Sequence, residues 1–216
     1  MVERLRSALL LVVVLLCSAS FALKQVETEH YIVAFREGQE FWAHEVIKVA
    51  EDVWDDLVTA YDLFEEYQKI TIYVEDRGDY AQGYAYPSKN KVVIHTTQLE
   101  LAIRSSDNWI RNVVVHELAH VFSMKKTSKD GFFRYFTVGR SSRYLNPNIA
   151  VQYHYSDLMA PMWWIEGVAQ YESCRNRGDS WDTHRDMFLR MAALEDDLLD
   201  FVEMGYFGSR NGFYPE

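Results

Sequence analysis

The stretch 113–122, near the middle of the chain, is apolar at every position except His116, Glu117 and His120. A helix with apolar residues on all its sides is buried, because it has no polar face to turn toward water. Ser106 and Asp107 precede the stretch and are typical helix caps. The pattern therefore predicts a helix over 108–124, enclosed between two parts of the fold.

The two histidines of this helix are four residues apart, so their imidazoles project from one face toward a common point. This is the spacing with which two nitrogen ligands bind one tetrahedral zinc ion. Glu117 lies about 100° around the helix from His116, beside such a metal rather than bonded to it. In that position a carboxylate can act as a general base toward water. The alternative is two ordinary core histidines on an apolar helix.

A zinc site of this kind needs a third protein ligand. Glu166 is a candidate because it lies in the apolar stretch 162–169, where an unpaired carboxylate would cost several kcal/mol. Glu166 could instead be an exposed helix acid. Because residues six apart lie about 120° from each other around a helix, Glu166 and Glu172 cannot both face one metal. The other candidates for the third ligand are His154, Asp157 and Glu172.

With these residues, the chain resembles the gluzincin peptidases. The motif 116–120 (His-Glu-Leu-Ala-His), followed by 164–169 (Trp-Ile-Glu-Gly-Val-Ala), is similar to the peptidase MA-like domains of secreted bacterial proteins, which often precede β-propeller repeats. The resemblance covers about residues 28–205. It implies a zincin-like fold, peptide hydrolysis and one zinc ion per chain. It also implies His116, His120 and Glu166 as ligands and Glu117 as the general base.

Several positions depart from related patterns. Ser123 and Lys126 stand where metzincins have glycine and a third histidine, so that class is excluded. Gly139 occupies the position of the third ligand in aminopeptidases of the gluzincin clan, so a longer insertion precedes Glu166. Gln170 replaces an aspartate that supports a histidine ligand in thermolysin-type enzymes.

Substrate contacts are also implied by the resemblance. Gly83, Tyr84, Ala85 and Tyr86 stand where the family has an edge strand that holds an extended peptide through main-chain hydrogen bonds. A plain hairpin explains the same residues. A donor to the oxyanion is also needed, and its candidates are Tyr153, Tyr155 and Tyr206.

The rest of the chain predicts an α+β fold with a mixed sheet and a helical C-terminal part. Strands are predicted over 31–36, 69–74 and 91–97, and helices over 40–66, 162–174 and 182–203. The order strand, helix, strand in 31–74 indicates a βαβ unit with parallel strands.

The N-terminal residues 1–22 have the features of an export signal: Arg4 and Arg6, then an apolar run, then a small-residue cleavage site ending at Ala22. The apolar run is too short to span a bilayer, and no membrane span is expected in the mature chain. We expect a periplasmic or extracellular protein. Cleavage would leave Cys174 alone, which excludes an intrachain disulfide and a cysteine-based zinc site.

The net charge of the chain limits the kinds of partner that it is expected to bind. Lys plus Arg total 22 against 32 Asp plus Glu, for a net charge of −10. A protein that tracks nucleic-acid phosphates normally carries the opposite charge, so a nucleic-acid partner is not expected.

Two functions remain open. The first is a zinc metallopeptidase domain over 23–216, cut short at its C-terminus and acting on a peptide or protein. The alternative is a catalytically silent zincin-like binding module of a larger secreted protein, with a C-terminal β-propeller.

Overall fold

The computed structural model describes residues 23–63, 68–76, 78, 81–97, 108–125, 136–137, 150–151, 162–180 and 183–199. The predicted signal peptide at 1–22 lies outside these residues and stays a prediction. Among the described residues, no helix is long and apolar enough to cross a bilayer.

The centre of the fold is a five-stranded mixed sheet with the order β1-β2-β3-β5-β4. The three inner strands are parallel, and an antiparallel strand flanks them on each edge. The parallel inner strands are buried on both faces and are rich in Val and Ile, as this arrangement requires. The strands are β1 (Lys24–Glu27), β2 (Tyr31–Phe35), β3 (Ile70–Glu75), β4 (Gly83–Tyr86) and β5 (Lys91–His95).

The parallel pairing of β2 with β3 confirms the predicted strand–helix–strand unit. The single helix predicted over 40–66 is wrong in extent, because the structure has two helices, α2 (Glu40–Asp52) and α3 (Trp54–Tyr61). They meet at Val53, whose φ of −100° and ψ of 0° depart from helical values. Asp62 ends α3 in the left-handed conformation.

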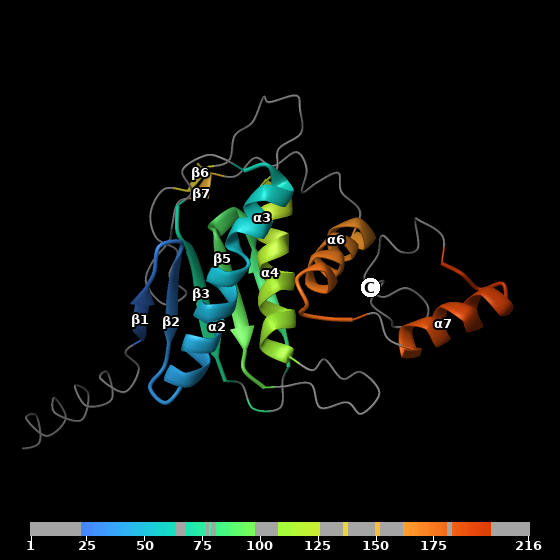
Figure 1. The fold of residues 1–216 in the computed structure, drawn as a ribbon, viewed down its shortest axis with the longest axis horizontal. Helices are drawn as coiled ribbons and strands as arrows, with labels where there is room; N and C mark the ends of the chain where they lie inside the picture. Colours follow the sequence, from blue (N-terminus) through green and yellow to red (C-terminus); the bar gives the residue numbers. More distant parts are fainter. Residues whose placement is uncertain are drawn as a thin grey trace, which may run out of the picture.

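Helix α4 (Trp109–Lys125) carries the 113–122 stretch and has buried residues on every side. It lies beside α2 and α3 over one face of the sheet, and Figure 1 shows it between the sheet and α6 (Met162–Arg175). Its N-terminus is capped by Asn108, whose Oδ1 accepts a hydrogen bond from the Arg111 N–H at 3.0 Å. The predicted caps Ser106 and Asp107 lie outside the described residues.

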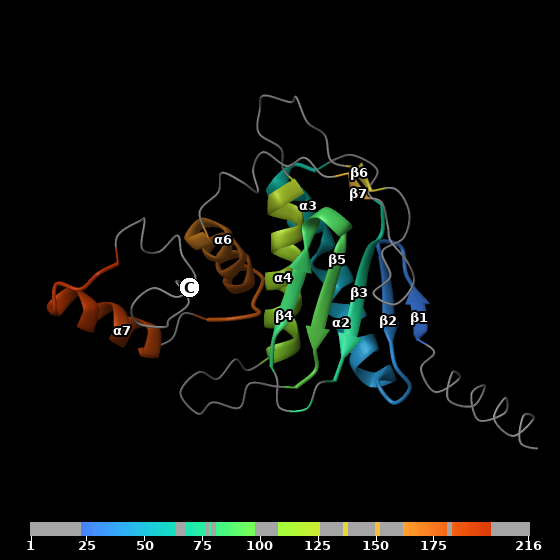
Figure 2. The same cartoon turned by 180° about the vertical axis from the view of Figure 1, so that it is seen from behind.

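The opposite face of the sheet, seen in Figure 2, carries no described helix. Helix α7 (Thr183–Leu194) follows α6 and lies farther from the sheet. Two short strands, β6 (Phe136–Thr137) and β7 (Ala150–Val151), form a separate antiparallel pair. The mixed sheet and its helices are compatible with the predicted α+β class.

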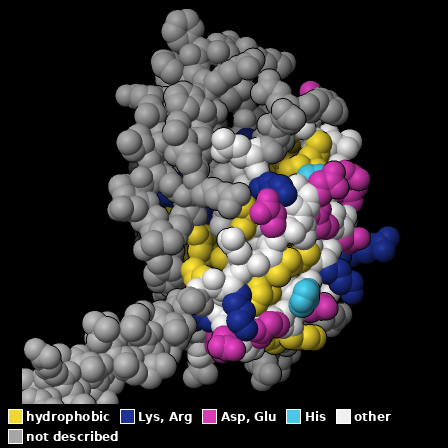
Figure 3. Space-filling view, turned by 90° about the vertical axis from the view of Figure 1, so that its left-hand side faces the viewer, with side chains coloured by type: hydrophobic (Ala, Val, Ile, Leu, Met, Phe, Trp, Pro, Cys, Tyr) yellow, Lys and Arg dark blue, Asp and Glu magenta, His cyan; other side chains and the backbone are white. Residues whose placement is uncertain are grey.

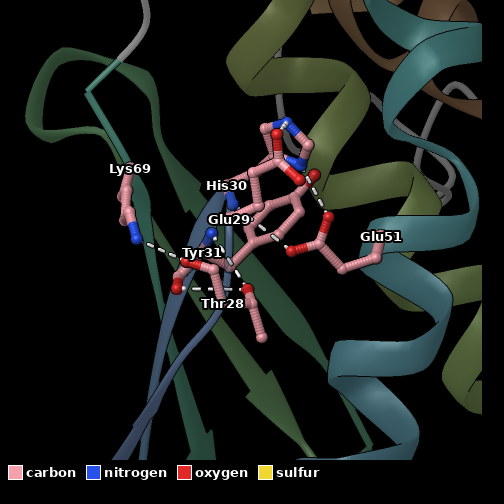
Figure 4. A network of polar contacts seen from close by, with 6 residues as sticks. All are labelled: Thr28, Glu29, His30, Tyr31, Glu51 and Lys69. Atoms are coloured by element: carbon pink, nitrogen blue, oxygen red, sulfur yellow. Dashed lines mark hydrogen bonds and ion pairs between the residues drawn. The ribbon is translucent and has the colours of Figure 1, made fainter.

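The turn between β1 and β2 is tied to the helix layer by polar contacts (Figure 4). The His30 ring nitrogen Nδ1 lies 2.6 Å from Glu51 Oε2, and the His30 N–H donates to Glu51 Oε1 at 3.3 Å. The Lys69 ammonium donates to the Thr28 carbonyl oxygen. The His30 ring also stacks on Trp54, with centroids 4.0 Å apart. These contacts hold the β1–β2 edge of the sheet against α2 and α3.

On the face shown in Figure 3, the described acidic and basic side chains lie interspersed. Lys24, for example, pairs with Glu40 at 2.7 Å, and both side chains are almost half exposed. Exposed pairs of this kind contribute little to stability, so the fold depends on the apolar layer between the sheet and helices α2, α3 and α4.

Candidate metal centre

His116 and His120 lie one turn apart on α4, as their spacing predicts. Their ring centroids are 4.8 Å apart, and the ring planes are almost perpendicular at 85°. His120 is 7% exposed, and both Nε2 atoms approach the same carboxylate oxygen on α6. The two imidazoles therefore present one nitrogen each toward a common point.

That carboxylate belongs to Glu166. Its Oε2 lies 3.2 Å from His116 Nε2 and 3.6 Å from His120 Nε2. Burial by itself raises the pKa of Glu166, but the hydrogen bonds and charges of the two histidines outweigh it and lower the pKa to about 2. Glu166 is therefore held as a carboxylate, which is the form that binds a metal.

The three side chains fit a metal ion. Their ligand atoms all lie within 4.8 Å of one another, and they form a group that could hold one. At metal–ligand distances of about 2.0–2.1 Å, two ligands of a tetrahedral zinc ion lie roughly 3.3 Å apart. The observed separations of 3.2 Å and 3.6 Å between Glu166 and the histidines are close to that value.

The approach of α6 to α4 depends on contacts at the far end of the ligand helix. Ser173 Oγ hydrogen-bonds Asn112, and the Arg111 Nε–H donates to the Asn176 carbonyl oxygen at 2.7 Å. Gly178 lies so close that a Cβ atom there would be 2.9 Å from Asn112 Cα. These contacts join the C-terminal end of α6 to the first turn of α4, and Glu166, farther back on α6, lies opposite the histidines.

The orientation of His120 is fixed mainly by packing. Its Nδ1 is buried, and no hydrogen-bond partner for it is found in the part of the chain that the structure describes. Histidine ligands of metals usually donate their second ring N–H to a carboxylate or carbonyl group. Here Nε2, which faces Glu166, is the nitrogen available to a metal.

Glu117 points toward β4. It is 7% exposed and lies against Gly83, the first residue of that strand. Within the described sheet β4 is the last strand, and it pairs only with β5. The Glu117 carboxylate therefore lies between α4 and the strand at this edge of the described sheet.

The other predicted residues of β4 divide between the two faces of the sheet. Ala85 packs against the apolar core beneath α4. Tyr84 faces the opposite side, where its ring meets His95 edge-on at 5.8 Å. Tyr86 lies near Lys91, whose ammonium is 5.2 Å from the ring centroid. Gly83 lies against Glu117, and β4 as a whole lies at an edge of the described sheet, as predicted.

Glu172, a competing candidate for the third ligand, has other partners. It is 4% exposed and accepts hydrogen bonds from Tyr61 Oη at 3.3 Å, Arg175 Nε at 2.8 Å and Asn176 Nδ2 at 3.2 Å. Burial and the nearby Glu172 carboxylate raise the pKa of Tyr61. Glu172 thus joins α6 to α3, and it is not in the group of possible metal ligands.

The remaining predicted residues lie outside the described part of the chain. They are the competing ligands His154 and Asp157 and the candidate oxyanion donors Tyr153, Tyr155 and Tyr206. Asn112, Ser173 and Gly178 were missed by the sequence reasoning, because nothing in their local pattern shows that they meet across two helices.

Comparisons with known proteins do not identify a function for these residues. No protein-family model matches the chain, and no curated protein sequence matches it. A function for the site therefore has to be argued from its residues.

Proposed function

We propose that this protein is a zinc metallopeptidase of gluzincin type, with His116, His120 and Glu166 as the zinc ligands. The observation that supports this most directly is the meeting of two histidine nitrogens and one carboxylate oxygen: the three atoms all lie within 4.8 Å of one another, and the carboxylate oxygen is 3.2 Å and 3.6 Å from the two nitrogens. Two imidazoles and one carboxylate are a donor set typical of catalytic zinc. Three protein ligands leave a fourth position open, as a catalytic site requires.

Glu117 is the general base in this proposal. Bound zinc would supply a Lewis acid that polarises the scissile carbonyl group and lowers the pKa of a water molecule. The Glu117 carboxylate then accepts a proton from the attacking water and passes it to the nitrogen of the leaving amine. As the last strand of the described sheet, β4 has an outer edge whose main-chain groups would pair with an extended peptide, and that peptide would lie beside the carboxylate.

The resemblance to the peptidase MA-like domains supports the same function, since it concerns the residues that meet in the structure. Under this proposal the chain has a zincin-like fold, is exported through the signal at 1–22, and acts on peptide or protein substrates. A catalytically silent binding module would have the same fold, so measurements of zinc binding and peptide hydrolysis are needed to distinguish it from a peptidase.

The test begins with the zinc content of the purified protein after exhaustive dialysis. We expect about one zinc ion per chain. Hydrolysis is then followed with a library of fluorescence-quenched peptides. Glu117→Gln should keep the zinc and reduce hydrolysis by about 10²–10⁴-fold, whereas His116→Ala should lose the zinc. Zinc binding without hydrolysis of any peptide would favour the binding module, and undiminished turnover in Glu117→Gln would refute the role of Glu117.

A further inference from the structure

Gly83 occupies a position where only a hydrogen atom fits. An ideal Cβ atom built there would lie 2.5 Å from Glu117 Oε1, 2.6 Å from Glu117 Cγ and 2.6 Å from Val113 Cγ2. Separations under 3.0 Å are essentially never seen for real Cβ atoms. Since Cγ is involved as well as the carboxylate oxygen, rotation of the carboxylate group alone would not relieve the clash.

The backbone does not explain this glycine. Gly38 and Gly78 have φ values of 89° and 67°, which other residues adopt rarely, but Gly83 lies in a strand and has no positive φ. An L-residue could adopt its conformation without strain. The space taken up by Glu117 and Val113 is therefore what restricts position 83.

Glu117 has little room to move aside. It is 7% exposed, and Val113, which precedes it by one helical turn and is 5% exposed, lies against the same point of β4. The β-branched side chain of Val113 is stiff in a helix. A methyl group at position 83 would have to displace the Glu117 side chain or push β4 away from α4.

We propose that Gly83 is a positioning residue for Glu117: its missing side chain makes the space in which that carboxylate is held between α4 and β4. The inference rests on the proposed function, since it takes Glu117 to be the general base. It differs from a role in peptide binding alone, because it concerns where the carboxylate lies before any substrate is bound.

The first measurement needs no catalysis. Gly83→Ala is made in the wild-type chain and in Glu117→Ala, and the free energy of unfolding of all four metal-free proteins is measured in urea. We expect Gly83→Ala to destabilise the wild type and to cost less than half as much where Glu117 has been removed. An equal cost in the two backgrounds would overturn the proposal. If Gly83→Ala does not fold, the substitution is made instead in Val113→Ala and in Val113→Ala/Glu117→Ala, which both lack the Val113 contact. It should cost less in the second of these proteins, and an equal cost in the two would likewise overturn the proposal.

The second measurement uses the zinc-loaded protein and the peptide that it cleaves fastest. Gly83→Ala should keep about one zinc per chain and lose at least about tenfold in kcat, with KM changed by less than about twofold, because a misplaced base affects the chemical step. An unchanged kcat would contradict the role of Gly83. Should the wild type prove inactive, the proposed function fails, and the unfolding measurements still decide whether Gly83 positions the carboxylate.

Gly167→Ala is the matched control. Gly167 is adjacent to Glu166 on α6, and a Cβ atom there would meet nothing within 4 Å. The same substitution at this position should leave zinc binding and kcat unchanged. A loss equal to that of Gly83→Ala would show that the effect at position 83 is not specific.

Discussion

Two glutamates of α6 show how position on one helix separates a ligand from a structural residue. Glu166 faces the histidines of α4, and Glu172, six residues later, faces Tyr61 and Arg175. Glu172 is buried and Glu166 is partly buried, and each carboxylate has its own set of partners. Only the partners of Glu166 are groups that also bind a metal.

Replacing Glu166 by glutamine should therefore affect zinc binding, whereas replacing Glu172 should affect stability. Glu166→Gln should lower zinc affinity by more than the roughly 10- to 100-fold expected when a group that merely supports a ligand is lost. Glu172→Gln should keep zinc affinity and lower the free energy of unfolding by about 1–3 kcal/mol, because donors from Tyr61 and Arg175 lose a charged acceptor. Zinc titration and urea unfolding of both variants check this. Zinc loss in Glu172→Gln alone would reassign the third ligand.

Between elements, the decisive contact is the packing of α6 on α4. Gly178 follows the end of α6 and lies against the backbone of α4, where a Cβ atom would be 2.9 Å from Asn112 Cα and 3.1 Å from the Arg111 carbonyl oxygen. Backbone atoms cannot rotate away as a side chain can. The separation of the two helices, and with it the distance from Glu166 to the histidines, depends on this contact.

Gly178→Ala should accordingly reduce both stability and zinc affinity. Overpacking at such a contact costs about 1–3 kcal/mol, and any outward shift of α6 moves Glu166 away from its partners. Gly167→Ala, within α6 itself, should instead raise the free energy of unfolding by up to about 1 kcal/mol, since alanine is the better helix former. Calorimetry with and without zinc measures both effects. Normal zinc affinity in a destabilised Gly178→Ala would show that the ligands tolerate the shift.

The stability contributed by the contact between the β1–β2 turn and α2 should depend on pH. Burial by itself raises the pKa of Glu51, but hydrogen bonds from Thr28 and His30 outweigh it and lower the pKa below its usual 4.5. The stabilisation by Glu51 is therefore present above that value and is lost as the pH falls through the lowered pKa. Between about pH 5 and pH 3, wild type should lose more stability than Glu51→Gln, as urea unfolding at each pH would measure. Parallel losses in the two proteins would contradict this.

At the scale of the whole molecule, the ligands come from two helices far apart in the sequence, so zinc binding should stabilise the entire fold. A ligand that binds only the native state at 1,000 times its dissociation constant adds about 4 kcal/mol. For a chain of this size we expect Tm to rise by about 8–16 °C on adding zinc. The rise should be reversed by EDTA and much smaller in Glu166→Gln. A Tm independent of zinc would argue against a site formed by the folded state.

The local features of this protein follow from its amino-acid sequence because they depend on neighbouring residues. The 113–122 stretch predicts its buried helix, the His116–His120 spacing predicts one shared face, and the apolar surroundings of Glu166 make it a candidate for the third ligand. The parallel β2–β3 unit is likewise predicted from a short alternation of elements.

Long-range packing settles what these patterns leave open. The sequence allows either Glu166 or Glu172 to face the histidines, and the rotation of α6 against α4, held by Ser173 and Gly178, turns Glu166 toward them. The interruption between α2 and α3 at Val53 and the contact of Gly83 with Glu117 are also decided by long-range packing. Each depends on atoms that are distant along the chain and meet only after the core has formed, so no local pattern of residues encodes them.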